Sequence, residues 1–309
     1  MSIDQPKVIT KKQAQKQIGY FGNSLIWYII AFTLLYHGTD FLHRYYPQIF
    51  RTYDHHMMML LFAILAMIVL TAIPFRLTNK KLSLKIRDYL KKPKIPTDRK
   101  ISIICIGIGI SLLTTSIASI FRFFLIANSQ TASYLGQFNN TTNIINNILY
   151  ICLFIIIKPI CDEYIFRGII QRQLGHYGRY FGVLGSAMLY AISSPSLSEA
   201  IPAFFVGWYL SLLTLKYHSI RPSIAVSITL SLFNWLLIVI PGNLIWIISI
   251  LIVIVYIVSA FSIFSKRVST NMVRYGATEW KLWKILLTTP SIIVCVILFL
   301  INVILAIII

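Results

Sequence analysis

Long runs of apolar residues, separated by short polar and basic segments, follow one another from residue 21 to the end of the chain. Nine of these runs approach or reach the length of a membrane-spanning helix, which takes about 20 apolar residues. We predict spans at Phe21–His37, Met57–Phe75, Ile101–Ala127, Ile144–Phe166, Phe181–Ser194, Ile201–Leu215, Pro222–Ile240, Leu244–Phe264 and Pro290–Ile309. The predicted fold class is therefore all-α, a polytopic transmembrane helical bundle of about nine spans.

The positions of lysine and arginine orient this layout. If the N-terminus is cytoplasmic, 24 of the 28 Lys and Arg residues fall in cytoplasmic segments, as the positive-inside rule requires. These residues lie before the first span and in Arg76–Lys100, Arg167–Arg179, Lys216–Arg221 and Lys266–Lys284. The opposite orientation would place them outside the cell. We therefore predict a cytoplasmic N-terminus and a multi-pass protein of the plasma membrane.

Composition supports a membrane location and favours membrane lipids as partners. Hydrophobic residues make up 57% of the chain and charged residues 12%, and the mean hydropathy is +0.77. A soluble domain of this size could not hide so much apolar surface from water. The formal net charge of +19 comes from short basic tracts beside apolar runs, which favours anionic membrane lipids as partners and not nucleic acid. The sequence predicts neither a cofactor nor an adequate histidine or cysteine set for a metal.

One charged stretch interrupts the apolar pattern at the end of the fourth predicted span, which reads KPICDEYIFRG from Lys158 to Gly168. Adjacent carboxylates in an apolar helix are costly and need a physical reason. Glu163 and Arg167 are four residues apart, as are Lys158 and Asp162, so both pairs face each other on a helix. Judged by its charges alone, the stretch is an ordinary ion-pair cluster where the helix leaves the membrane.

The same stretch resembles the first motif of the CPBP intramembrane endopeptidases, a family that includes CAAX-type prenyl-protein proteases and bacterial Abi-type membrane proteins. That motif reads Pro-Ile-x-Glu-Glu-x-x-Phe-Arg-Gly. The matching residues are Pro159, Ile160, Glu163, Phe166, Arg167 and Gly168. Asp162 stands where the family has its first glutamate.

The order of later motifs supports the resemblance, which covers about Ile144 to Ile240. The segment from Leu189 to Ser194 fits the phrase that ends in the family's first histidine, and Ser194 takes the place of that histidine. The Gly-x-x-x-Gly-like repeat of the next helix corresponds to Gly207 and Ser211.

The last motif of the family is a proline followed by a His-x-x-x-Asn helix. Counted from Pro222, the histidine falls on Ser227 and the asparagine on Ser231. A shifted frame would use Asn234 but would put Leu230 at the histidine.

The resemblance implies a mechanism that this sequence carries only in part. Asp162 would be the general base acting on a water, with Glu163 and Arg167 as its support. The positions of the two histidines and the asparagine are the three serines Ser194, Ser227 and Ser231. Serine donates a hydrogen bond but neither carries a positive charge nor accepts a proton usefully near neutral pH. Lys158 would favour the ionised and weakly basic form of Asp162.

The leading hypothesis is therefore a catalytically degenerate family member that binds or scaffolds another membrane protein, or a lipidated or membrane peptide. One alternative is an active intramembrane endopeptidase with Asp162 and Glu163 as general base. In that case Ser194 and Lys158 could form a Ser–Lys dyad, although serine is more often a packing residue in membrane helices. A second alternative is a small transporter or flippase, for which we find no corresponding pair of broken helices.

The predicted organisation has three parts. Residues 1–100 hold two spans and a basic cytoplasmic loop. Residues 101–240 form the helical core that resembles the CPBP and Abi proteins. Residues 241–309 hold two C-terminal spans joined by a basic cytoplasmic linker.

Overall fold

The computed structural model describes residues 11–38, 53–84, 89–125, 144–239 and 279–308, and the single residues 41, 45, 46, 48 and 254. Every element longer than one residue in these ranges is helical, which confirms the all-α fold class. The predicted span Leu244–Phe264 lies outside the described residues, apart from Ile254.

The helices of the N-terminal part are α1 (Lys11–Thr33) with π-helical η1 (Leu34–Gly38), α3 (Tyr53–Met67) with π-helical η3 (Ile68–Ala72) and α4 (Ile73–Lys81), and α5 (Thr97–Leu125). One long rod follows, made of α7 (Ile144–Tyr150), π-helical η6 (Ile151–Ile157), α8 (Lys158–Glu163), π-helical η7 (Tyr164–Ile170) and α9 (Gln171–Gly175). The remaining helices are α10 (Arg179–Ile192), α11 (Leu197–Tyr217), α12 (Arg221–Val239), α14 (Glu279–Leu287) and α15 (Pro290–Ile308).

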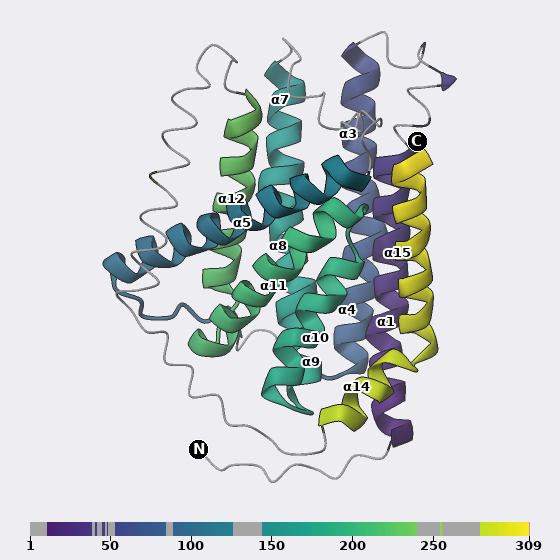
Figure 1. Cartoon of the computed structure of the whole chain (residues 1–309), viewed down its shortest axis with the longest axis vertical. Helices are drawn as coiled ribbons and strands as arrows, with labels where there is room; N and C mark the ends of the chain where they lie inside the picture. The colour runs from purple at the N-terminus through teal and green to yellow at the C-terminus, as the bar shows by residue number, and fades with distance from the viewer. Residues whose placement is uncertain are drawn as a thin grey trace.

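The rod that carries the charged motif stands in the middle of the bundle (Figure 1). Helices α1, α4 and α15 pack together on one side of it, and α12 lies on the other side. Helix α5 crosses the bundle obliquely and packs against α11 and α12. The motif therefore lies between the N-terminal helices and the α10–α11 pair, where side chains from both can reach it.

Two apolar clusters hold this arrangement. The larger one joins α1, the motif rod, α10 and α14, and its fully buried members include Phe21, Phe166, Phe181 and Leu286. The smaller one joins α5, α11 and α12 and consists of Ile108, Leu210, Leu213, Val226 and Leu230. The motif rod thus belongs to the larger cluster, which fixes its position against α1.

Local sequence signals explain where several helices begin. Ser196 caps α11 by accepting a hydrogen bond from the N–H of Glu199, 3.3 Å away, in the Ser-x-x-Glu pattern of a capping box. Helices α14 and α15 meet at an angle of 64° immediately before Pro290, which has no N–H to continue the preceding helix. The short turn between α10 and α11 places Ser193, Ser194 and Pro195 inside the bundle.

The apolar surface fits a membrane environment, although the number of spans stays a prediction. By length and composition, three described helices could cross a bilayer: Leu60–Lys81, Arg99–Ile120 and Leu197–Tyr217. A fourth is added if the bent pair α14–α15 counts as one span. Large apolar side chains are exposed along α3 and α15, as expected of helices that face lipid.

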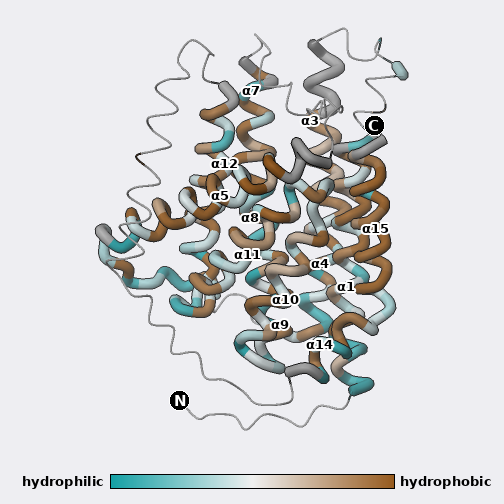
Figure 2. Tube along the Cα trace, in the orientation of Figure 1, coloured by the Kyte–Doolittle hydropathy of each residue, from teal (hydrophilic) through white to brown (hydrophobic). Residues whose placement is uncertain are grey.

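Basic residues of the described helices gather at one end of the bundle. Lys11 and Lys12 open α1, Lys80 and Lys81 end α4, and Arg221 opens α12. Figure 2 shows hydrophilic residues at these helix ends, below a predominantly hydrophobic middle layer. The positive-inside rule expects such a one-sided distribution of basic residues.

Candidate functional site

The charged motif occupies a short α-helical stretch between two π-helical ones. Helix α8 runs from Lys158 to Glu163, and η6 and η7 adjoin it on either side. Pro159 stands at the beginning of α8 and has no N–H for the helical hydrogen-bond ladder, so the preceding turn is relaxed there. Wide π-helical turns of this kind are frequent at functional sites. Asp162, Glu163 and Arg167 lie in this region with side chains that are each at most 2% exposed.

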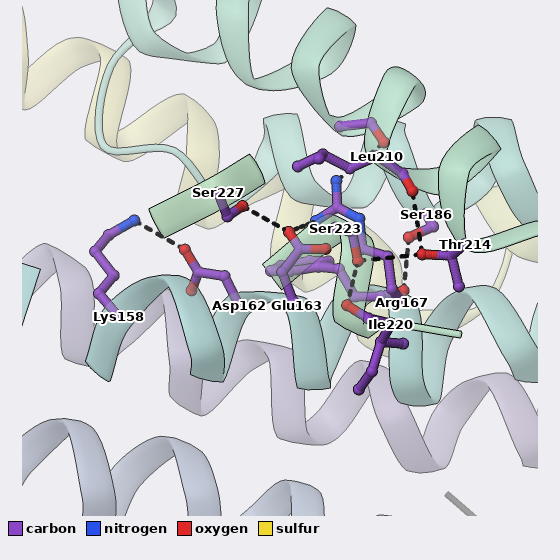
Figure 3. Close-up of polar contacts among 12 residues, drawn as sticks. Lys158, Asp162, Glu163, Arg167, Ser186, Leu210, Thr214, Ile220, Ser223 and Ser227 are labelled. Atoms are coloured by element: carbon purple, nitrogen blue, oxygen red, sulfur yellow. Dashed lines mark hydrogen bonds and ion pairs between the residues drawn. The ribbon is translucent and has the colours of Figure 1, made fainter. Parts of the chain in front are cut away.

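Asp162 has both carboxylate oxygens engaged. Its Oδ1 accepts a hydrogen bond of 2.6 Å from the hydroxyl of Tyr28, which belongs to α1. Its Oδ2 forms an ion pair of 2.9 Å with Nζ of Lys158 (Figure 3). The ammonium group of Lys158 also lies 5.3 Å from the centre of the Phe32 ring, within reach of a cation–π contact. The negative charge of Asp162 is thus matched by one cation and one neutral donor.

Glu163 lies in a sealed pair with Arg167. Nη1 of Arg167 is 3.0 Å from Oε1 of Glu163, and both side chains are fully buried. The same oxygen accepts a 3.0 Å hydrogen bond from the hydroxyl of Ser227 on α12 (Figure 3). The second oxygen, Oε2, is buried and has no hydrogen-bond partner among the described residues. One acidic group therefore holds the motif rod and α12 together.

Small residues on α11 let the motif rod bond to its backbone. Arg167 donates from Nη2 to the carbonyl oxygen of Gly207 at 2.9 Å, and Gln171 donates from Nε2 to that of Ser211 at 2.8 Å. A Cβ on Gly207 would come within 3.0 Å of the Tyr190 ring and 3.2 Å of Nη2 of Arg167. The guanidinium carbon also lies 4.8 Å from the centre of the Tyr190 ring. The small residues Gly207 and Ser211 therefore let the motif rod lie close to α11, and their carbonyl oxygens accept hydrogen bonds from it.

A cavity of about 430 Å³ lies between α1, α5, the motif rod, the α10–α11 turn and α12. Hydroxyl groups line it, and we call it the hydroxyl-lined cavity; they belong to Tyr28, Ser111, Thr115, Ser119, Tyr190, Ser193, Ser194, Ser198, Ser227 and Ser231. Lys158 and Glu199 are its charged lining residues, and Asn234 also faces it. This volume is in the range of about 300–1,000 Å³ that is usual for ligand pockets.

The predicted site residues divide into two groups around this cavity. Lys158, Ser194, Ser227 and Ser231 line it, whereas Asp162, Glu163 and Arg167 do not. Ser227 joins the two groups through its bond to Glu163, but Ser194 and Ser231 form no hydrogen bond with the acidic pair. The carboxylates thus lie behind the cavity wall.

Two residues of the cavity wall carry no recognisable signal in the sequence. Tyr28 lies 134 residues before Asp162, in a helix without any part of the motif, and only its polar hydroxyl on a buried helix face hints at a partner. Glu199 belongs to no motif of the family, although the Ser-x-x-Glu spacing places it at the start of α11. Within the described residues, no cluster of three or more His, Cys, Asp or Glu side chains could hold a metal ion.

This geometry restricts proton transfer. A general base must reach the proton that it takes directly or through one water. Both oxygens of Asp162 already bond to Tyr28 and Lys158, and Glu163 is enclosed by Arg167 and Ser227. In this arrangement neither carboxylate is presented to a ligand in the cavity. The groups presented are hydroxyls, the Lys158 ammonium, the carboxylate of Glu199 and the amide of Asn234.

Comparison with known proteins identifies the region around the site. Residues 144–236 match the family model described as type II CAAX prenyl endopeptidase Rce1-like. The match runs from the start of α7 into α12 and includes every residue of the charged motif, but not Tyr28. No curated protein and no solved structure matches the chain significantly. The resemblance seen in the motif is confirmed for residues 144–236, which are similar to the Rce1-like, CAAX-protease-type endopeptidases.

Proposed function

We propose that this protein binds the C-terminal segment of a membrane-anchored peptide in the hydroxyl-lined cavity without hydrolysing it. The observation that carries the proposal is the enclosure of both motif carboxylates in ion pairs behind the cavity wall. A hydrolase of this kind needs a carboxylate that faces a water next to the scissile bond. Here the cavity meets the partners of the carboxylates instead, namely Lys158, Tyr28 and Ser227.

The three serines support the absence of hydrolysis. Ser194, Ser227 and Ser231 stand where the family has two histidines and an asparagine, and all three line the cavity. Removal of a single oxyanion donor typically costs about 100- to 1,000-fold in rate. Serines also cannot supply the acid–base step of histidine, and the hydroxyl of Ser227 is already used by Glu163.

The lining of the cavity suits an extended peptide end. Hydroxyl groups both donate and accept hydrogen bonds, so they complement the alternating N–H and C=O groups of a peptide backbone. The Lys158 side chain is 26% exposed and is the cation of the cavity wall, which suits a terminal carboxylate. The apolar residues Phe32, Val206 and Leu230 complete the wall and can contact the side chains of such a peptide.

A binding measurement with matched peptides tests this function. The full chain is reconstituted in liposomes and titrated with a fluorescent prenylated peptide that ends in a free carboxylate, and with the same peptide ending in an amide. We expect the carboxylate form to bind at least about 10-fold more tightly, which corresponds to one charge-assisted contact. Mass spectrometry should recover the bound peptide intact.

A cavity-filling variant supplies the control. Ala203→Phe places a ring in the cavity and should abolish binding, because Ala203 lines it. Ala225→Phe adds the same ring on the exposed face of α12 and should leave binding unchanged. Equal affinity for both peptides, or binding that survives Ala203→Phe, would refute a peptide site in this cavity.

We also propose that the protein resides in the plasma membrane with its N-terminus in the cytoplasm. The gathering of Lys11, Lys80 and Arg221 at one end of the bundle supports this orientation. A cysteine introduced by Lys12→Cys should react with a membrane-impermeant thiol reagent only after the cells are opened. Labelling of this cysteine in intact cells would show that the N-terminus lies outside the cell.

A further inference from the structure

A second cavity is lined by Arg167, which does not line the hydroxyl-lined cavity. It has a volume of about 250 Å³ and is formed by the end of the motif rod, the beginning of α10 and the end of α11. Its basic lining residues are three arginines and two histidines: Arg167, Arg172, Arg179, His176 and His218. No acidic side chain of the described residues lines it. We call it the arginine cavity.

Two of these arginines have nitrogen atoms without partners. Arg167 is fully buried, and its Nε has no hydrogen-bond partner within the described part of the chain, although Nη1 and Nη2 reach Glu163 and Gly207. Nη1 of Arg172 is likewise buried and unpartnered within that part. A buried N–H of a charged group that lacks an acceptor is strongly unfavourable, so an acceptor from outside the protein is expected there.

The surroundings hold the Arg172 fork in place. Its guanidinium carbon lies 4.6 Å from the centre of the Tyr89 ring, which restricts the plane of the group. Partial burial, and then the charge of Arg172, lower the pKa of His176 beside it. Gln171 is 6% exposed, and its Oε1 is buried without a partner among the described residues. The cavity therefore offers several fixed donors together with one free acceptor.

We propose that the arginine cavity binds a phosphate group, carried either by an anionic lipid headgroup or by a soluble phosphate. Planar guanidinium forks match the oxygens of phosphate in a bidentate way, and several of them around one small cavity suit a multiply charged group better than a single carboxylate. A hydroxyl of the ligand, from a protonated phosphate or a polyol headgroup, supplies the donor that Oε1 of Gln171 lacks.

The place of the cavity in the fold fits this ligand. Arg172 and Arg179 lie next to the turn between α9 and α10, at the end of the bundle where the basic helix termini gather (Figure 1). That end is predicted to meet the anionic inner leaflet, which attracts basic side chains. Arg167 is shared between the ligand and Glu163, so it is unsuitable for a test because its loss would also break the buried ion pair.

The test compares two charge-matched double variants of the full chain. Arg172→Gln/Arg179→Gln removes two arginines of the cavity. Lys216→Gln/Arg221→Gln removes two exposed basic residues near the same end, outside the cavity. Thermal unfolding is followed in nanodiscs of phosphatidylcholine with and without phosphatidic acid, and in detergent with sodium phosphate against sodium chloride at equal ionic strength.

We expect phosphatidic acid, sodium phosphate or both to raise the unfolding temperature of the wild type and of the Lys216/Arg221 variant equally. The Arg172/Arg179 variant should lose most of this rise, and its apparent affinity should fall by roughly 10-fold for each arginine removed. A response to the lipid alone assigns the site to a headgroup, and a response to the salt alone assigns it to a soluble phosphate.

Two outcomes overturn the proposal. In the first, neither phosphatidic acid nor sodium phosphate raises the unfolding temperature of the wild type. In the second, the unfolding temperatures of the two double variants rise equally, which would mean that the anion acts on the basic surface in general and not on the arginine cavity. If Arg172→Gln/Arg179→Gln is not folded, the single Arg179→Gln variant replaces it, because Arg179 is exposed and its loss leaves the buried groups in place. An Arg179→Gln variant that responds as fully as Arg221→Gln likewise overturns the proposal.

Discussion

The two ion pairs of the motif rod are one residue apart, yet their surroundings differ. Glu163 and Arg167 are both fully buried, and the pair is surrounded by Gly207, Tyr190 and Ser227. Lys158, in contrast, remains 26% exposed at the wall of the hydroxyl-lined cavity, while Asp162 behind it is buried. The first pair joins helices, whereas the second pair holds a cation at the edge of a cavity.

This difference separates structural and ligand-binding roles within a single motif. A fully buried pair contributes little by its presence but costs much when one partner is removed, because an uncompensated charge remains. A partly exposed lysine can exchange its partner for a ligand at much lower cost. Four single substitutions should reveal this difference as unequal losses of stability.

Glu163→Gln should have the largest effect, since it leaves the fully buried Arg167 guanidinium without its counter-ion. We expect a loss of about 3–5 kcal/mol in the free energy of unfolding. Size-exclusion chromatography and thermal unfolding in detergent would show reduced folded protein. Glu163→Leu/Arg167→Met should recover part of the loss, because both charges leave together. Wild-type stability of Glu163→Gln would contradict the structural role of this pair.

Lys158→Ala should be milder, because Tyr28 continues to donate to Asp162. We expect the free energy of unfolding to fall by about 2–3 kcal/mol, because the substitution removes a hydrogen bond to a charged group and leaves the Asp162 carboxylate buried. The folded yield and unfolding temperature in detergent measure it. Asp162→Asn in the same chain should restore most of the yield; no change in either readout for Lys158→Ala would mean that Asp162 needs no cation.

Tyr28→Phe removes only the 2.6 Å hydrogen bond to Asp162 and keeps the ring that packs on Phe32 and Phe166. The expected loss is about 1.5–2 kcal/mol. A double-mutant cycle with Asp162→Leu checks the cause, because the effect of Tyr28→Phe should largely disappear in that background. An undiminished effect would point to altered packing of α1.

Ser227→Ala is expected to have the smallest effect, about 1 kcal/mol, since Glu163 keeps its Arg167 partner. Ser231→Ala is the matched control on the same helix: it lines the cavity but does not bond to the acidic pair, and it should change stability by less than about 0.5 kcal/mol. Thermal unfolding of both variants side by side makes the comparison. Equal changes in the unfolding temperature of the two variants would show that the hydroxyl of Ser227 does not stabilise the acidic pair.

Much of the local structure could be predicted from the sequence. The predicted spans of the described region fall on helices, and the i,i+4 spacing of Lys158, Asp162, Glu163 and Arg167 brings the two pairs together. Local periodicity determines both features, because side chains four residues apart on a helix face each other. Counting from Pro222 also led to Ser227, whose hydroxyl reaches Glu163.

The features that could not be predicted depend on long-range packing. Tyr28 meets Asp162 across 134 residues of sequence, and neither residue carries a signal for the other. The π-helical turns η6 and η7 change the helical register by an amount that apolar runs do not encode. The oblique path of α5, which contributes Ser111 and Ser119 to the cavity, follows from its packing against α11 and α12.

A cleavage measurement tests whether the motif carboxylates, held in ion pairs, leave a bound peptide unhydrolysed. The full chain in liposomes is incubated at length with the prenylated peptide that binds to it, and the peptide mass is followed. We predict that the peptide remains intact with the wild type and with Asp162→Asn alike. Cleavage by the wild type that Asp162→Asn abolishes would contradict the account.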